Sequence, residues 1–242
     1  MEKNLVVKLI VTIIMSLNLF ANDSKNKYVF ATGELDGTYD RIAKEQFNSQ
    51  HNMIYKNTAG SFENVYLMIN NRIDYALTQK DALNFVDYNL KEHNDSIDNY
   101  VKQLFVLGKE NLYLLVNLDS HIKSVKDLDN LKVSCGMAMS GSCLTLTFIE
   151  KYFEIKVNRV LDSYSNSIDS LQNNSIDALF IVTKKESNLL KNIKNVRAIS
   201  IENNELSKLY EEKKVKQNEH HFLNDDLMTY SIDIIFIKKK GF

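Results

Sequence analysis

Most glycines of this sequence lie in short loops that also carry hydroxyl groups. Five of the seven glycines fall in three loops, each placed where a strand is expected to lead into a helix. Glycine lets the backbone approach a ligand closely. The first turn of a helix offers free N–H groups and the positive end of its dipole, which favour an anion such as a carboxylate. The loops contain Gly33 and Gly37, Gly60, and Gly136 and Gly141.

Polar residues beside these glycines form a candidate binding set. Hydroxyl groups flank all three loops, and Gln79 and Thr183 follow corresponding strands in the two halves of the chain. Glycine and serine also cap helices and form turns, so one loop alone favours a structural role. The paired loops together favour ligand binding. The predicted ligand-binding residues are Gly37, Thr38, Tyr39, Thr58, Ser61, Gln79, Ser140, Gly141, Ser142 and Thr183.

Three charged residues lie near this set, and two of them allow a second interpretation. Asp81 and Lys184 follow the same two strands and should reach the cleft, although Asp81 could instead cap a helix. Glu110 lies where the chain is expected to cross between halves. It could bind an amine or a cation, or it could be a solvated hinge residue.

The second half of the sequence repeats the plan of the first. The segment from Asn70 to Leu77 is echoed by the segment from Asn173 to Phe180, and Gly33 corresponds to Gly136. The spacing of about 100 residues is the size of one small domain and is too long for a solenoid repeat of about 20–50 residues. We therefore expect two similar lobes, and a cleft between lobes is a usual place for a small ligand.

The elements that must position these residues follow the order β-α-β-α-β in each half. This order is typical of a parallel sheet covered by helices. We expect Ser61 and Ser165 to cap helices, and Ser124 to Asp127 to form a capping box. The predicted strands are 27–32, 53–55, 73–78, 101–108, 112–117, 131–135, 156–161, 176–182, 196–201 and 229–238, and the predicted helices are 38–48, 62–70, 81–86, 142–151 and 165–173.

The predicted fold class is α/β, with two similar lobes and a ligand cleft between them. Residues 22–110 plus about 226–242 would form the first lobe, and residues 111–225 the second. No Pro-rich or Ser/Gly-rich linker separates the halves, so the crossings should be strands that both lobes share. The polar stretch 202–224 is predicted to be a helix and a loop.

The beginning of the chain resembles a signal peptide, residues 1–21. A basic start with Lys3 and Lys8 precedes an apolar run from Leu9 to Phe20, which is short for a membrane span of roughly 20 residues. Leu19 fits the cleavage rule poorly, so an uncleaved anchor is the alternative. We expect an exported, periplasmic protein. In that compartment Cys135 and Cys143 can form a disulfide or remain two free thiols.

Composition argues against several classes of function. The net charge of −1 and the absence of an extended basic patch argue against nucleic acid as a partner. No phosphate-loop or dinucleotide motif indicates a cofactor. No catalytic triad has a familiar spacing, so an enzyme is not expected. His220 and His221 with nearby acids match no common metal pattern, and a hydrolase using them is a third hypothesis.

Several short motifs occur in an order that is more specific than any one of them. They are the loop Thr32 to Tyr39, the segment Thr58 to Asn64, the strand end Asp74 to Asp81, the segment Ser124 to Val133 and the loop Met139 to Ser142. Together they are similar to the solute-binding subunits of tripartite ATP-independent periplasmic (TRAP) transporters of the TAXI subtype. The likeness covers residues 28–183 and, more weakly, 226–238. Lys109-Glu110 stands where that family usually has Pro-Glu, and the second loop lacks the family's Pro.

This resemblance implies a type 2 periplasmic-binding-protein fold that closes on a ligand. It implies a small organic acid or an amino acid such as glutamate as ligand, and membrane transporter subunits as partners. It supports cleft roles for Thr38, Tyr39, Ser61, Gln79, Ser140 and Ser142. The alternative is a ligand-sensing or partner-binding module on the same fold, with a sensor protein as its partner.

Overall fold

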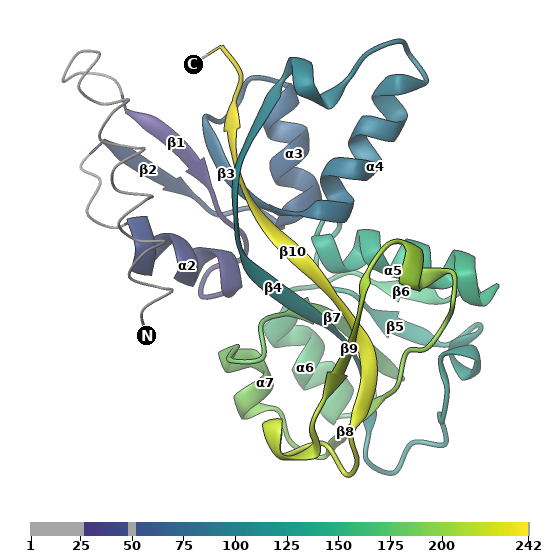
Figure 1. Ribbon diagram of the computed structural model, residues 1–242. Helices are drawn as coiled ribbons and strands as arrows, with labels where there is room; N and C mark the ends of the chain where they lie inside the picture. Colours follow the sequence, from purple (N-terminus) through teal and green to yellow (C-terminus); the bar gives the residue numbers. More distant parts are fainter. Residues whose placement is uncertain (1–26, 48–51, 242) are drawn as a thin grey trace.

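The computed structural model describes residues 27–47 and 52–241, which form a mixed α/β fold around one ten-stranded sheet (Figure 1). Eight strands follow the order β2-β1-β3-β10-β4-β7-β5-β6, while β8 pairs with β4 and β9 with β10. The predicted α/β class is confirmed. The strands are β1 (Tyr28–Ala31), β2 (Met53–Lys56), β3 (Tyr75–Gln79), β4 (Val101–Asn117), β5 (Lys132–Ser134), β6 (Asn158–Val160), β7 (Ala178–Thr183), β8 (Val196–Ile199), β9 (Glu211–Val215) and β10 (Leu227–Lys239).

Two parallel groups of strands flank the central antiparallel pair of β4 and β10. In one group β1 pairs with β2 and β3, and in the other β5 pairs with β6 and β7. We call each group with its helices a lobe, upper and lower in Figure 1. The first lobe carries α2 (Thr38–Phe47), α3 (Ser61–Ile69) and α4 (Lys80–Lys91), and the second carries α5 (Gly141–Phe153), α6 (Tyr164–Gln172) and α7 (Asn188–Asn192).

The long strands β4 and β10 run through both lobes. They pair from Val101 with Lys239 to Asn111 with Ser231, and β4 continues from there against β7. The prediction of two separate strands, 101–108 and 112–117, is wrong, because the chain stays extended through Gly108. Gly108 has a φ of 141° and lies beside a register shift in β10, so it bends the strand without ending it. The expectation that strands cross between the lobes agrees with this arrangement.

Buried apolar residues follow the predicted faces of the elements. The inner face of α2 presents Ile42, Ala43 and Phe47, and the Phe47 ring packs edge-on against Phe30 of β1 at 5.1 Å. Burying such an aromatic side chain contributes about 1.5–3 kcal/mol. The apolar segment 112–116 of β4 is buried on both faces, because alternate residues enter two different cores.

The segment predicted to be a helix and a loop, 202–224, instead contains the strand β9. Its residues Glu211 to Lys214 are charged, and only Val215 is buried. A single buried position gives no recognisable period, and charge on an edge strand discourages pairing with other chains. Short 3₁₀ turns flank it, at Leu206–Lys208 and Gln217–Glu219. Two others occur at Ile97–Asn99 and Val125–Leu128.

Two predicted helix caps are wrong and one is confirmed. Ser61 is the first residue of α3, not its cap, and its hydroxyl bonds elsewhere. Helix α6 is capped by Ser163, whose side chain accepts a hydrogen bond from Asn166, and not by Ser165. The capping box from Ser124 to Asp127 is present and opens a 3₁₀ turn.

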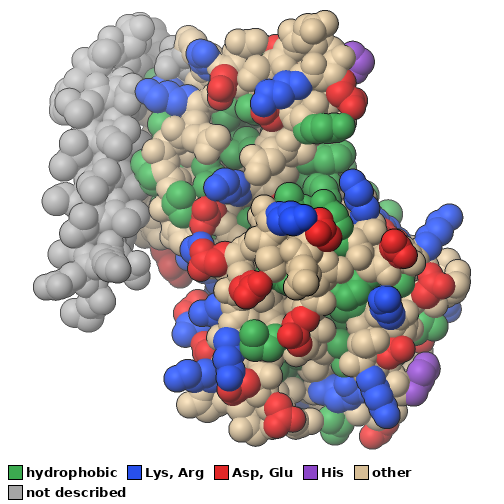
Figure 2. Space-filling model, turned by 45° about the vertical axis from the view of Figure 1, so that its right-hand side comes forward, with side chains coloured by type: hydrophobic (Ala, Val, Ile, Leu, Met, Phe, Trp, Pro, Cys, Tyr) green, Lys and Arg blue, Asp and Glu red, His purple; other side chains and the backbone are tan. Residues whose placement is uncertain are grey.

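The lobes also meet on the side of α4 and α5. The ring of Phe85 in α4 lies 5.7 Å from Phe62 of α3 and 6.2 Å from Phe148 of α5, measured between centroids. Figure 2 shows hydrophobic side chains gathered along the waist between the two parts of the molecule. The lobes are therefore in direct contact away from the ligand-side loops.

The signal peptide predicted for residues 1–21 lies outside the described residues. Within residues 27–47 and 52–241, every helix is too short or too polar to cross a membrane. The lobe limits predicted at about 110 and 226 remain a prediction.

Candidate functional site

A cavity lies between the two lobes, where the loops after β1, β2 and β5 face one another. It contains about 460 Å³ of atom-free space, part of which is open to solvent. Both lobes contribute to its lining. Eight of the ten predicted ligand-binding residues line it: Gly37, Thr38, Tyr39, Ser61, Gln79, Gly141, Ser142 and Thr183.

The other two predicted residues, Thr58 and Ser140, support the loops from behind. The Thr58 hydroxyl donates to Asn64 Oδ1 at 2.6 Å, and Asn64 in turn donates to the carbonyls of Thr32, just after β1, and of Leu77 in β3. The Ser140 side chain caps α5 by accepting from the Cys143 N–H at 3.1 Å. Both hydroxyls are buried, take part in these hydrogen bonds and do not line the cavity.

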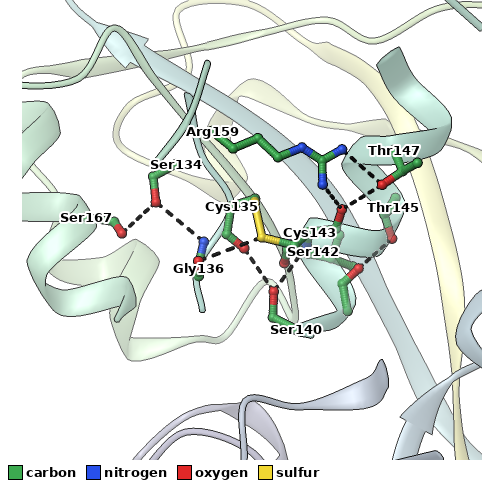
Figure 3. The surroundings of a disulfide bond; sticks show 12 residues. Ser134, Cys135, Gly136, Ser140, Ser142, Cys143, Thr145, Thr147, Arg159 and Ser167 are labelled. Atoms are coloured by element: carbon green, nitrogen blue, oxygen red, sulfur yellow. Dashed lines mark hydrogen bonds between the residues drawn. A yellow bond between two sulfur atoms is a disulfide. The ribbon is translucent and has the colours of Figure 1, made fainter. Parts of the chain in front are cut away.

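A disulfide holds the start of helix α5, which carries Gly141 and Ser142 (Figure 3). Cys135 follows β5, and Cys143 lies in the first turn of α5, with their Cα atoms 4.8 Å apart. Ser140 donates to the Cys135 carbonyl at 3.0 Å, and Arg159 donates to the Cys143 carbonyl at 3.1 Å. The start of α5 is thus fixed by covalent and hydrogen bonds before any ligand enters.

A buried hydrogen-bond network occupies the first-lobe side of the cavity. The Tyr39 hydroxyl contacts Ser61 Oγ at 2.9 Å and donates to Glu110 Oε2 at 3.1 Å. Ser61 Oγ also accepts from the Gln79 N–H, and Gln79 Nε2 donates to Glu110 Oε2 at 3.3 Å. The network makes Glu110, which lies on the shared strand β4, the carboxylate at the base of the site.

Glu110 is buried in this network and lines the cavity. Its exposed fraction is only 2%, so the interpretation as a solvated hinge residue is wrong. Burial raises the pKa of its carboxyl to about 7, although bonds from Gln79 and Tyr39 and the charge of Lys184 act in the opposite direction. Near neutral pH this carboxyl is therefore poised between its neutral and charged forms.

The second lobe contributes a tyrosine that the sequence did not indicate. Tyr164, in the first turn of α6, lines the cavity and donates to Ser142 Oγ at 2.6 Å. Ser142 Oγ also accepts from the Val182 N–H at 2.8 Å. Burial raises the pKa of Tyr164 well above its ordinary value, so its hydroxyl stays protonated and donates. Helix position alone gives no signal for this role.

Glu34 is a second carboxylate of the lining that sequence reasoning missed. Its Oε2 accepts from the Tyr164 N–H at 3.2 Å, across the two lobes. Burial raises the pKa of this carboxyl above its usual value. Glu34 lies in the predicted loop between Gly33 and Gly37, and its place there was the available signal.

The lobes are closed on each other around the cavity. Thr38 Oγ1 and Thr183 Oγ1 are 2.8 Å apart, one from each lobe. On another side, the Glu63 N–H donates to the Met139 carbonyl at 3.0 Å. These direct interlobe bonds describe a closed conformation.

Asp81 and Lys184 do not line the cavity, contrary to the expectation that they reach the cleft. The Asp81 carboxylate instead lies inside the interlobe contact, where it accepts from Thr145 at 2.7 Å and from Tyr210 at 2.9 Å. Burial raises its pKa to about 6. Asp81 therefore joins α4 of the first lobe to the second lobe.

The hydrolase hypothesis required His220 or His221 at the cleft. Neither residue lines the cavity. His220 stacks on Phe222 with ring centroids 4.9 Å apart and bonds the Tyr113 hydroxyl at 3.0 Å. Among the described residues, no group of three or more His, Cys, Asp or Glu side chains is arranged to hold a metal ion.

We expect the ligand-free protein to lose stability as pH rises from about 4.5 to 7. Glu110 and Asp81 have raised folded-state pKa values, so the folded protein retains protons that the unfolded chain has released. The stabilising contribution is complete below the unfolded pKa and is lost as pH rises through the folded pKa. For Glu110 it is on the order of 3 kcal/mol. Urea unfolding across this range should show a smaller decline in Glu110→Gln, and identical declines would contradict the assignment.

Solved structures with the same fold include two that hold a small molecule. The chain is similar to a periplasmic transporter structure (TM-score 0.60, 13% identity, 91% of this chain and 79% of that one). It is similar to the arginine-bound form of truncated ArgBP from T. maritima (0.55, 13%, 90% and 90%). It is also similar to the effector-binding domain of QuiR in complex with shikimate (0.54, 13%, 90% and 90%). At these identities the likeness shows the fold alone.

Sequence comparison gives the family. Among curated protein sequences, none matches this chain. The pattern of one protein family matches residues 34–220, more than half of the chain, and this range includes every residue that lines the cavity except Gly33. By this match, the chain belongs to the NMT1-like family.

Proposed function

We propose that this chain is an exported solute-binding protein. It captures a small organic anion or an amino acid between its lobes and delivers the ligand to a TRAP-type membrane transporter. The observation that carries the proposal is the cavity between two lobes that bond directly across it, for example from Thr38 to Thr183. Such interlobe cavities are usual ligand sites. The structural relatives that bind small molecules support it.

The chemistry of the lining favours an amino acid over a simple anion. Glu34 and Glu110 are the charged side chains among the described residues that line the cavity, and no Lys or Arg is among them. A ligand with only negative charge would face two carboxyl groups without a cation beside it. The ammonium group of an amino acid would place a positive charge beside these carboxyl groups.

The disulfide supports export. Bonds such as the one between Cys135 and Cys143 persist in oxidising compartments and are rare in the cytosol. Export is also favoured by the leader predicted for residues 1–21 and by the motifs that resemble those of TRAP subunits.

The alternative function is a ligand-sensing module that is not coupled to transport. The likeness to the effector-binding domain of QuiR in complex with shikimate favours this candidate, because that domain is named for binding an effector and is similar in fold. Affinity capture from membranes separates the two functions. Transporter membrane subunits should be recovered with the protein under the first proposal, and a sensor protein under the second.

We expect a small amino acid to raise the melting temperature in a thermal-shift panel of amino acids and organic acids. A ligand that binds only the folded state stabilises it by about 2.7 kcal/mol at 100 times its Kd. For a chain of this size that corresponds to a shift of about 5–10 °C. Unfolded protein and a compound-free sample serve as controls. A panel in which no compound shifts the melting temperature would refute the proposed function.

A further inference from the structure

The lining of the cavity contains hydrogen-bond acceptors without a partner. Two buried oxygens in its lining have no partner within the described residues: Glu34 Oε1 and Gln79 Oε1. Gln79 is 2% exposed, and its amide orientation follows from Nε2 donating to Glu110, which leaves Oε1 as the free acceptor. An unpartnered buried acceptor is unfavourable unless a ligand supplies a donor.

The two tyrosine hydroxyls of the lining already donate within the protein. The Tyr39 hydroxyl donates to Glu110, and the Tyr164 hydroxyl donates to Ser142. Thr38 and Thr183 bond to each other. None of these bonds satisfies Glu34 Oε1 or Gln79 Oε1, and a ligand group that carries N–H donors would do so.

The charge of the cavity indicates the same kind of group. None of the ion pairs found in the described part of the chain includes Glu110 or Glu34. Lys184 influences Glu110 by its charge but does not line the cavity. Buried carboxylates are normally paired with a cation.

We propose that Glu110, together with the free oxygens of Glu34 and Gln79, holds a protonated nitrogen of the ligand. The ligand is thus a small organic cation or zwitterion with an ammonium or amidinium group, and an organic acid without such nitrogen is excluded. This inference rests on the proposed solute-binding function and narrows its ligand class.

The site should release a proton when it binds such a ligand. Around Glu110 lie Tyr39 of α2, Gln79 of β3, Lys184 after β7 and the more distant Asp81 of α4. Burial raises the pKa of Glu110 to about 7, and a bound cation favours its charged form. Affinity should therefore rise with pH by up to about tenfold per unit between pH 5 and 7.

The test uses pairs of compounds that differ only in the cationic nitrogen. They are L-alanine and L-lactate, L-glutamate and 2-hydroxyglutarate, propylamine and propanol, and acetamidine and acetamide. We expect the nitrogen cations to raise the melting temperature and their partners to leave it unchanged. Binding measured by calorimetry in two buffers should show proton release near pH 6.

Variants then assign the effect to the carboxylate. Glu110→Gln should weaken binding of the active compounds by at least tenfold and remove its pH dependence. The matched control is Glu186→Gln, an exposed carboxylate on the β7–α7 connection that does not line the cavity. Should Glu110→Gln fail to fold, proton release by the wild-type protein remains the decisive measurement.

The outcomes separate this inference from the function on which it rests. Equal shifts by both members of each pair, shifts by the acids alone, or nitrogen-selective binding without proton release would overturn the ammonium site and leave solute binding intact. A panel in which nothing binds would overturn both.

Discussion

Replacing Gly141 with alanine is expected to weaken ligand binding by about 10- to 100-fold. Gly141 is the first residue of α5, and a Cβ atom there would lie 2.1 Å from Gln79 Oε1 and 2.8 Å from Ser61 Oγ. Both contacts belong to the opposite lobe. Overpacking of this kind costs about 1–3 kcal/mol, and each 1.4 kcal/mol is a factor of ten in an equilibrium constant.

The same substitution should leave each lobe folded. Gly141 has helical backbone angles, so alanine causes no local strain, and its helix propensity is higher than that of glycine. The steric conflict therefore exists only when the lobes are closed. We expect a larger radius of gyration in small-angle scattering and little loss of secondary structure.

A compensating substitution tests this explanation. Adding Gln79→Ala to Gly141→Ala removes the closest steric conflict and should restore the compact shape, although the Gln79 hydrogen bonds are lost. Ser165→Ala, an exposed position in the first turn of α6, is the control for a change at a helix start. A Gly141→Ala protein as compact and as strongly bound to ligand as the wild type would refute the role of this contact.

The repeat in the sequence was the strongest guide to the site. Gly33 and Gly136 correspond, and the loops that follow them do face each other across the cavity. These loops could be predicted because an apolar strand, a glycine and the start of a helix each have a recognisable sequence pattern. The lining by Gln79 and Thr183 followed from the same logic, since parallel strands end at one edge of a sheet.

What the sequence could not give depends on long-range contacts. Tyr164 enters the cavity because α6 begins one residue earlier than predicted, after the Ser163 cap. Glu110 is buried because Tyr39 and Gln79 from other elements cover it, and nothing near it in sequence reveals this. Strand β9 is specified by its pairing with β10 and not by an apolar period.

Asp81 forms a contact between the two lobes that lies outside the cavity. Its carboxylate is buried and accepts from Thr145 of α5 and from Tyr210 before β9. Thr145 has a second acceptor, the Gly141 carbonyl at 3.0 Å. Tyr210 thus depends more strongly on Asp81, since an unmet buried hydroxyl costs about 1–3 kcal/mol.

Asp81→Ala is therefore expected to lower the free energy of unfolding at pH 5 by about 1–3 kcal/mol, and by less at pH 8. The folded pKa of about 6 lies above the unfolded value, so the wild type retains about half of the Asp81 contribution at pH 5 and loses the rest as pH rises. Asp81→Asn keeps a neutral acceptor, and we expect it to exceed the wild type slightly at pH 5 and by more at pH 8. Urea unfolding at both values measures this.

The control is Glu92→Ala, which removes an exposed carboxylate from the end of the same helix. It tests whether the loss of any negative charge from α4 changes stability. Its free energy of unfolding should stay within about 0.5 kcal/mol of the wild type at both pH values. An Asp81→Asn protein less stable than the wild type at pH 8 would show that the negative charge itself holds the lobes. The neutral hydrogen-bond acceptor would then be insufficient, and closure would have to strengthen with rising pH.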